Sequence, residues 1–375
     1  MASADIAALR LCAQGISCPS STVHEAVSRL LVVQAQDRPS SLWAIGLRSS
    51  ASKIADVERA VASGSIVRTW LMRGTLHFTA AEDLRWLLHL VAPRLIARSK
   101  RRDEQLRLDD LVYERSSDIL ISELDSQGQM TRSDIMVALE RKGITTTGQR
   151  AYHILRHLAL QGVISFGPMI GREPSFVLLD NWIQSSKNIT REQALGELAV
   201  RYFSGHGPAT AQDLVWWSGL TMAEVRKSIE AAGSRLNEET MDGITYFSGP
   251  SRSGTGENTH VLLPAFDEYI IGYKERGALL DREHTKDVLS SNGIFYPALV
   301  IEGLVQGTWR GRRSKAGITV EVKPFYRLNS SDIDSLEHAV KRYSTFLDVP
   351  ISLSSMGQMA MGNRLFQGSS ASHRL

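Results

Sequence analysis

Two short strings repeat one local plan, and this repeat constrains the fold more than any other feature of the chain. Residues 128–135 read GQMTRSDI and residues 207–214 read GPATAQDL, so both place a threonine three residues before an aspartate. A threonine at a helix N-cap accepts from the backbone N–H three residues on, and a carboxylate there suits the positive end of the helix dipole. Thr131 and Thr210 are therefore predicted to begin helices.

The second of three expected units surrounds the first of these caps. Helix-period segments at 111–124, 133–143 and 148–162 precede two strand-like strings, VISFGP and SFVLLD. Three helices followed by a β-hairpin are the plan of a winged helix, a helix-turn-helix with an added hairpin.

Residues 190–263 repeat this order, and residues 5–80 fit it more loosely. In the third unit we expect GITYFS and HVLLPAF to pair across the Gly- and Ser-rich loop at 249–259. In the first unit, Thr22 and Glu25 give the same cap signature, and the expected hairpin turns at Arg73-Gly74. The fold class predicted is α+β, with three tandem winged-helix units and a C-terminal β-rich element. The expected boundaries are 1–110 (first unit with linking helices), 111–182, 188–263, 264–350 (the β-rich element) and 351–375 (a flexible tail).

Composition places the chain among ordinary globular proteins. It has 375 residues, 43% of them apolar and 22% charged, and a net charge of +3, which permits nucleic-acid binding without requiring it. No apolar run approaches the roughly 18 residues that span a bilayer. The N-terminus lacks a signal-peptide pattern, and the two cysteines are too few for a disulfide framework. We expect a cytoplasmic protein with no membrane contact.

Basic residues gather in two places. The stretch 94–107 carries several arginines, and either phosphate binding or a solvated helix face explains it equally well. The second cluster is TWRGRRSK, expected as a turn between two strands. Four cations crowded there repel one another, so a role in DNA binding is favoured for Arg310, Arg312, Arg313 and Lys315.

Histidine spacing does not indicate a metal site. His153 and His157 stand at i and i+4, but the glutamate of a zinc-protease motif is missing and their apolar neighbours are typical of a helix core. The chain also lacks a P-loop, a GxSxG motif and a dinucleotide fingerprint, so neither a metal nor a cofactor is expected.

Two blocks are dense in unusual side chains. RTWLMRGTLHF includes Trp70 on one strand face, and LLPAFDEYIIGYKERG includes Asp267, Glu268 and Tyr269. Structural packing and ion pairs would explain both blocks. Asp267 and Glu268 are also the best candidates for a carboxylate that acts on water.

These blocks, together with GPATAQDLVWWSGL and the string QAQ, resemble the winged-helix DNA glycosylases of bacteria. The resemblance covers about residues 5–350. It implies three winged helices bent into a C-shape around DNA, a monomer at the nucleoid, and catalysis by a Gln-x-Gln motif, here Gln34 and Gln36. It further implies that the substrate is double-stranded DNA carrying an alkylated guanine, including bulky natural-product adducts and interstrand crosslinks from antibiotic self-resistance. The residues expected to contact DNA are Arg68, Arg73, His77, Arg252 and the four cations at 310–315, and Trp70, Asp267 and Tyr269 are expected to support the site.

Chemistry makes two glutamines reasonable in such an enzyme. Alkylation at guanine N7 makes the base cationic, so it leaves without a general acid, and the protein need only align a water and stabilise an oxocarbenium-like state. On an extended segment Gln34 and Gln36 would point the same way. Three alternatives remain: the amides cap a helix that ends at Val33, the whole protein is a non-enzymatic winged-helix regulator, or it is an enzyme that acts on RNA or a free nucleoside, for which the sequence has no positive feature.

Overall fold

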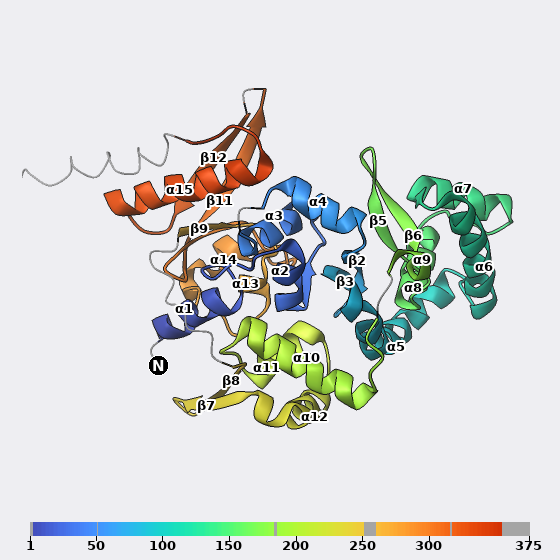
Figure 1. Cartoon of the computed structure of the whole chain (residues 1–375), viewed down its shortest axis with the longest axis horizontal. Coiled ribbons are helices and arrows are strands. Elements are labelled where there is room, and N and C mark those ends of the chain that lie inside the picture. Colours follow the sequence, from blue (N-terminus) through green and yellow to red (C-terminus); the bar gives the residue numbers. More distant parts are fainter. Residues whose placement is uncertain (1–2, 51, 184–185, 251–259, 316, 355–375) are drawn as a thin grey trace, which may run out of the picture.

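A computed structural model describes residues 3–50, 52–183, 186–250, 260–315 and 317–354 of the chain. Runs of helices and runs of strands follow one another along it, and the described strands form sheets of six, five and two strands in which every named pair except β12–β13 is antiparallel (Figure 1). The α+β class is therefore confirmed. In this part of the chain no helix combines the length and the apolarity needed to cross a membrane.

The first region ends in the predicted hairpin. Its strands β2 and β3 pair antiparallel, and Gly74 takes a positive φ of 91° at the turn, as glycine does readily. Thr22 caps the second helix in a capping box with Glu25, as predicted. The elements here are α1 (Ser3–Ala13), α2 (Val23–Leu30), β1 (Val32–Gln34), α3 (Arg38–Arg48), α4 (Ile54–Ala62), β2 (Ile66–Leu71) and β3 (Thr75–Ala80).

The apolar run before the two glutamines is a strand and not the end of a helix. Helix α2 stops at Leu30, and Leu31 turns the chain with a φ of 67°. Strand β1 then pairs antiparallel with β3, with Gln34 opposite His77. The alternative in which the two amides cap a helix ending at Val33 is therefore wrong.

The middle region follows the predicted element order. Thr131 caps α7 in a capping box with Asp134. Strand β5 pairs with β2 at Phe166 and Arg68, so the two hairpins share one six-stranded sheet in the order β1-β3-β2-β5-β6-β4. The elements are α5 (Ala81–Gln105), α6 (Asp110–Gln127), β4 (Met130–Thr131), α7 (Arg132–Arg141), α8 (Arg150–Leu160), β5 (Ile164–Ile170), β6 (Glu173–Leu178) and α9 (Leu179–Trp182).

In the third region the predicted hairpin is wrong. Strand β8 pairs with the preceding strand β7, across a turn at Asp242-Gly243. Both turn residues have positive φ, 48° and 75°, as the two-residue Asp-Gly hairpin turn requires. The elements are α10 (Arg191–His206), α11 (Ala211–Ser218), α12 (Met222–Ala232), η1 (Gly233–Arg235), β7 (Asn237–Met241) and β8 (Ile244–Ser248).

The string HVLL instead begins the C-terminal sheet. It forms β9, the edge of a five-stranded sheet in the order β13-β12-β11-β10-β9, so the expected boundary at residue 263 is wrong. The expected flexible tail is also wrong at its start, because residues 351–353 pair with β12; residues 355–375 lie outside the described part. The elements are β9 (His260–Leu263), α13 (Glu268–Ile271), η2 (Arg282–His284), α14 (Thr285–Val288), β10 (Ala298–Ile301), β11 (Leu304–Ser314), β12 (Gly317–Pro324), α15 (Ser330–Leu347) and β13 (Ile351–Leu353).

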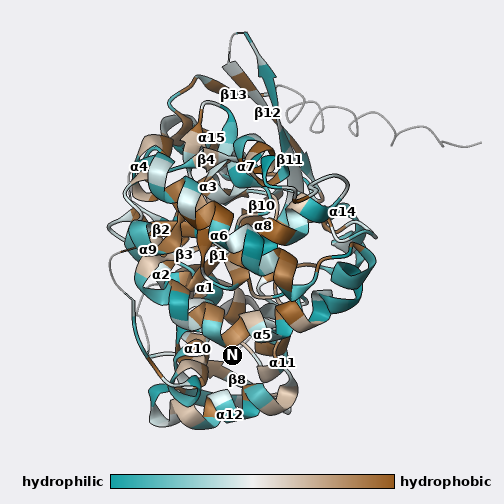
Figure 2. Cartoon of the chain, turned by 90° about the vertical axis from the view of Figure 1, so that its right-hand side faces the viewer, coloured by the Kyte–Doolittle hydropathy of each residue, from teal (hydrophilic) through white to brown (hydrophobic). Residues whose placement is uncertain are grey.

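The first region lies between the other parts. In Figure 1, α6–α9 lie to the right of β2 and β3, and α10–α12 lie below them. The β11–β12 hairpin projects at the top, on the opposite edge from α10–α12. Strand β2 is buried along its whole length, and hydrophobic colouring gathers around β1–β3 in Figure 2. The division into three winged-helix units and the C-shape around DNA stay predictions.

Candidate active site

Gln34 and Gln36 lie where strand β1 leaves the sheet. Gln34 is the last residue of β1 and is 8% exposed, whereas Gln36 is exposed to solvent. Between them, Ala35 is fully buried and donates its N–H to the carbonyl oxygen of Leu76 at 2.7 Å. The motif therefore begins on a rigid strand and ends at the surface.

The main chain between the glutamines is also fixed by an arginine. Arg68 on β2 donates to the Ala35 carbonyl from Nε (3.2 Å) and from Nη2 (2.9 Å), and its guanidinium lies over the Phe166 ring at 4.8 Å. Burial lowers the pKa of Arg68 to about 10, so it is still cationic at neutral pH. Arg68 was expected to contact DNA; with 8% exposure its observed contacts are with the motif backbone instead.

Both amide oxygens have one donor each among the described residues. The Thr75 hydroxyl donates to Gln34 Oε1 at 3.1 Å, and the Leu76 N–H approaches Gln36 Oε1 at 3.4 Å. A carbonyl oxygen has two lone pairs. Each glutamine can therefore accept one further hydrogen bond, for example from a water molecule.

A buried carboxylate lies behind the strand. Glu268 Oε1 accepts from the backbone N–H of Gln34 at 2.9 Å, and Oε2 accepts from the indole N–H of Trp217 at 3.0 Å. His206 Nε2 lies 3.6 Å from Oε2. From the sequence, Glu268 is predicted only as a candidate carboxylate that acts on water. No local sequence signal predicts its contact with Gln34, which lies 234 positions earlier.

His77 lies inside the protein. It is 2% exposed, and its Nδ1 is 2.9 Å from the Thr75 carbonyl. Burial lowers the pKa of His77 to about 4, so the ring is neutral at pH 7. The ring is thus held inside the protein, and the expected contact between His77 and DNA stays a prediction. Trp70 is also buried, against Tyr152 and Phe166, where it supports the sheet.

Arg73 lies at the turn of the same hairpin and joins it to α11. Its Nη1 donates to the carbonyls of Trp216 and Trp217, and its guanidinium lies 5.7 Å from the Trp216 ring centre. Trp216 is 40% exposed. Arg73 thus stabilises the C-terminal end of α11, and whether it also contacts DNA stays a prediction.

Asp267 and Tyr269 have structural contacts. Asp267 forms a bidentate ion pair with Arg48 at 2.7 and 2.9 Å, with both side chains fully buried. The Tyr269 hydroxyl donates to the carbonyls of Ala7 and Gly303. Neither side chain can reach a substrate at the surface, so any support they give to the site is indirect.

Three cations of the basic cluster, Arg310, Arg312 and Arg313, lie on the end of β11, and Lys315 lies in the turn that follows. Arg310 and Arg312 are on one face of β11, and each places Nε 2.6 Å from a carboxylate oxygen of Glu321 on β12. Arg313 and Lys315 are exposed beside them. All four cations thus remain accessible to a polyanion, while Arg252 lies outside the described residues.

Other candidates from the sequence have local partners. His153 pairs with Asp103 at 2.7 Å and His157 stacks on Tyr113 at 3.6 Å, so the two do not face a common ion. Within the described residues no group of His, Cys, Asp and Glu could hold a metal. In the 94–107 cluster, Arg94 bonds Glu224, which supports a structural role for that arginine.

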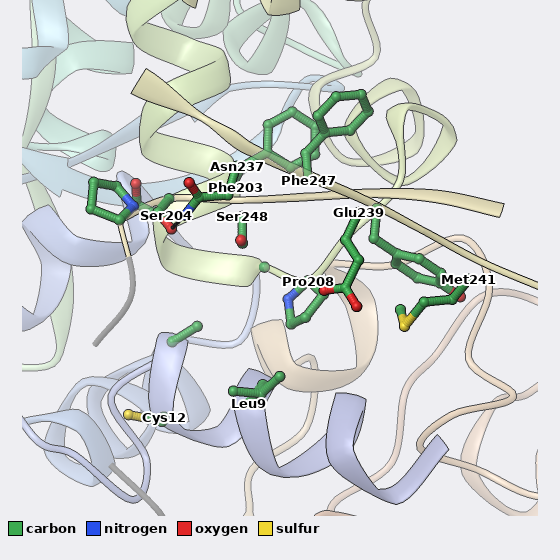
Figure 3. A pocket seen from close by; sticks show the side chains of 15 residues that line it. Leu9, Cys12, Phe203, Ser204, Pro208, Asn237, Glu239, Met241, Phe247 and Ser248 are labelled. Carbon is green, nitrogen blue, oxygen red and sulfur yellow. Dashed lines mark hydrogen bonds between the residues drawn. The ribbon is translucent and has the colours of Figure 1, made fainter. Parts of the chain in front are cut away.

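A cavity of about 260 Å³ lies away from the glutamines, between α1, the end of α10 and the β7–β8 hairpin. Figure 3 shows Phe203 and Phe247 on one side of it and Leu9 and Cys12 on the other, with Glu239 over the middle. None of the lining residues belongs to the predicted site. The glutamines therefore do not open into this cavity.

Comparison with known proteins agrees with the fold class. A family model described as DNA glycosylase AlkZ-like matches residues 27–346. A protein of Streptomyces sahachiroi named "Interstrand DNA cross-link repair glycosylase" is 27% identical over 315 residues, which cover 77% of this chain and 82% of that protein. The solved structure of the Streptomyces sahachiroi DNA glycosylase AlkZ superposes with a TM-score of 0.72 at 23% identity, covering 94% of this chain and all of that one.

Proposed function

Because the chain belongs to the AlkZ-like DNA glycosylase family, we propose that it hydrolyses the N-glycosidic bond of cationic N7-alkylguanine in duplex DNA through Gln34 and Gln36. The observation that carries this proposal is the position of the motif. One glutamine is anchored on a buried strand and the next is exposed two residues later.

The reaction needs little from the protein besides alignment. Alkylation at N7 makes the base a good leaving group, so the barrier falls when a water is held near C1′ and the developing positive charge on the sugar is stabilised. Amide oxygens can accept from that water and present a partial negative charge to the sugar. Gln34 and Gln36 each have one lone pair that the described residues leave for this purpose.

The backbone contacts support this assignment. Arg68 and Leu76 hold both peptide groups of Ala35, so the two glutamines are joined by a fixed linker. A catalytic group acts best when the protein has already ordered it. Anchoring of this kind is what a pair of catalytic amides requires.

The substrate range and DNA contacts complete the proposal. The relative named for interstrand crosslink repair supports bulky adducts and crosslinks as substrates, and we propose that the protein acts as a monomer at the bacterial nucleoid. The exposed cations Arg310, Arg312, Arg313 and Lys315 would contact phosphates, which give affinity without reading sequence.

The test is base release from a defined duplex. Wild-type protein is incubated in excess with a duplex carrying one 7-methylguanine, or one bulky N7 adduct, and free base and abasic sites are measured. We expect excision, and a loss of at least about a hundredfold in rate for Gln34→Ala with Gln36→Ala. Gln161→Ala, an exposed glutamine at the end of α8, is the matched control and should excise at the wild-type rate.

Two outcomes would contradict the proposal in different ways. If wild-type protein binds the duplex and releases no base from either substrate, the N7-alkylguanine activity is wrong. If the double variant excises as fast as wild type, the activity stands and the assignment to Gln34 and Gln36 is wrong.

A further inference from the structure

Glu268 is a buried carboxylate that the reaction described above does not use. It is 1% exposed and is the first residue of α13. Its two oxygens accept from different parts of the chain: the Gln34 N–H at 2.9 Å and the Trp217 indole N–H at 3.0 Å. A carboxylate placed so deeply cannot activate water on DNA, so its effect must pass through the residues it touches.

The geometry of β1 explains why Gln34 needs this partner. Strand β1 is an edge of the six-stranded sheet, with β3 on one side only. Backbone N–H groups alternate between the two sides of a strand, and Ala35 points its N–H to β3, so Gln34 points its own to the open side. A buried N–H without an acceptor is costly, and Glu268 supplies the acceptor.

The acceptor is charged, which makes the contact stronger than an ordinary sheet hydrogen bond. Burial by itself would raise the pKa of Glu268, but the adjacent His206 and the hydrogen bond from the Gln34 N–H hold that pKa below its usual value. The group is therefore ionised at neutral pH. The charged carboxylate therefore accepts a hydrogen bond from the backbone N–H of Gln34, the first residue of the motif.

Glu268 is itself held in place from several directions. Its neighbour Asp267 is locked by the bidentate pair with Arg48, and the Gln14 amide donates to the Glu268 carbonyl at 3.1 Å. Trp217 belongs to α11 and is 1% exposed. The carboxylate thus joins α11 and α13 to the edge of the sheet at Gln34.

We propose that Glu268 is a positioning residue for base excision, which fixes the backbone of Gln34 so that its side chain meets the attacking water. The inference rests on the proposed function and on the role of Gln34 in it. Loss of the carboxylate should slow the chemical step while DNA binding stays intact, because Glu268 has no access to the DNA surface.

The experiment compares Glu268→Gln with wild type in three measurements. Single-turnover excision of 7-methylguanine reports the chemical step, fluorescence anisotropy reports the Kd for the same duplex, and thermal unfolding reports Tm. The matched control is Asp103→Asn, which removes another buried carboxylate that contacts a histidine, His153, outside the site. We expect Glu268→Gln to lower the excision rate about tenfold to a hundredfold with Kd within twofold of wild type. Asp103→Asn should lower Tm alone.

A double-mutant cycle separates positioning from a general loss of structure. In the Gln34→Ala background Glu268→Gln should cost little further rate, because it acts through a side chain that is already gone. A structural role would slow both backgrounds equally. If Glu268→Gln unfolds at the assay temperature, Glu268→Asp takes its place with the same expectations, since it keeps the charge and withdraws the carboxylate by one methylene.

The outcomes are distinguishable from failure of the proposed function. No excision by wild type overturns that function. Excision by wild type together with a normal rate for the Glu268 variant overturns the positioning role. Equal losses of rate in the wild-type and Gln34→Ala backgrounds overturn it as well.

Discussion

Arginines in two regions of this molecule face different surroundings. Beside the Gln-x-Gln motif, Arg68 is 8% exposed and donates twice to the Ala35 carbonyl. On the β11–β12 hairpin, Arg310 and Arg312 have more than half of their side chains exposed and share the carboxylate of Glu321. The sequence had assigned all three to DNA.

The difference shows that an arginine near an active site need not touch the substrate. A buried guanidinium needs acceptors for its N–H groups, and the Ala35 carbonyl accepts from both Nε and Nη2 of Arg68. An exposed guanidinium keeps most of its N–H groups hydrogen-bonded to water, and its surface ion pair adds little to the free energy of unfolding. The motif region thus uses charge to hold the backbone, and the hairpin keeps charge available for phosphates.

The largest expected effect is on folding, in the buried region. Asp267→Asn leaves Arg48 fully buried without its charge partner, so the free energy of unfolding should fall by about 3–5 kcal/mol. Denaturant unfolding measures this. Glu321→Gln on the hairpin is the control and should leave the unfolding midpoint almost unchanged; equal losses in the two variants would contradict the comparison.

A second expected effect is a pH dependence confined to the buried region. The folded protein depresses the pKa of His77 to about 4 from 6.5, so the unfolded chain takes up the proton first as pH falls. The stability contributed by the neutral ring is complete above pH 6.5 and is lost as pH falls towards 4, by roughly 3 kcal/mol. The measurement is the free energy of unfolding at several pH values. His77→Asn should remove its pH dependence between pH 6.5 and 4, whereas Arg312→Ala should keep that dependence.

A third effect separates chemistry from binding. Arg68→Lys replaces a two-nitrogen contact with a single one, so the Ala35 carbonyl is held less firmly and excision should slow about tenfold. Because Arg68 is only 8% exposed, the salt dependence of binding should not change. Single-turnover kinetics measure the excision rate, and Kd at several salt concentrations gives the salt dependence of binding. A smaller slope of log Kd against log salt in Arg68→Lys would show that Arg68 contacts phosphate.

The smallest effect is expected at the hairpin. Arg312→Ala should weaken binding to any duplex about threefold and reduce the slope of log Kd against log salt by about 0.9, with single-turnover excision at saturation unchanged. The control is Arg115→Ala on α6, an exposed arginine far from the hairpin (Figure 1), which should leave the slope as it is. Equal slopes of log Kd against log salt for Arg312→Ala and wild type would show that the hairpin does not contact DNA.

Local sequence signals predicted most of the helices and the first two hairpins. Thr22, Thr131 and Thr210 cap helices as expected, because a capping box depends on four consecutive residues. The third predicted hairpin was wrong, because Asp242-Gly243 forms a two-residue turn that pairs β7 with β8, whereas the prediction placed the turn in the glycine-rich loop that follows.

Caps, periodicity and the Gln-x-Gln string are properties of short segments, so the candidate residues and the α+β class could be predicted from the amino-acid order. The contacts of those residues depend on the folded chain. That β1 is an edge strand, that Glu268 meets Gln34 across 234 positions and that Arg68 faces a carbonyl instead of solvent all depend on chain segments that folding brings together. Burial then determines the charge state of each group and whether it can contact a substrate. The burial of a residue depends on the packing of the whole chain and not on the adjacent residues in the sequence.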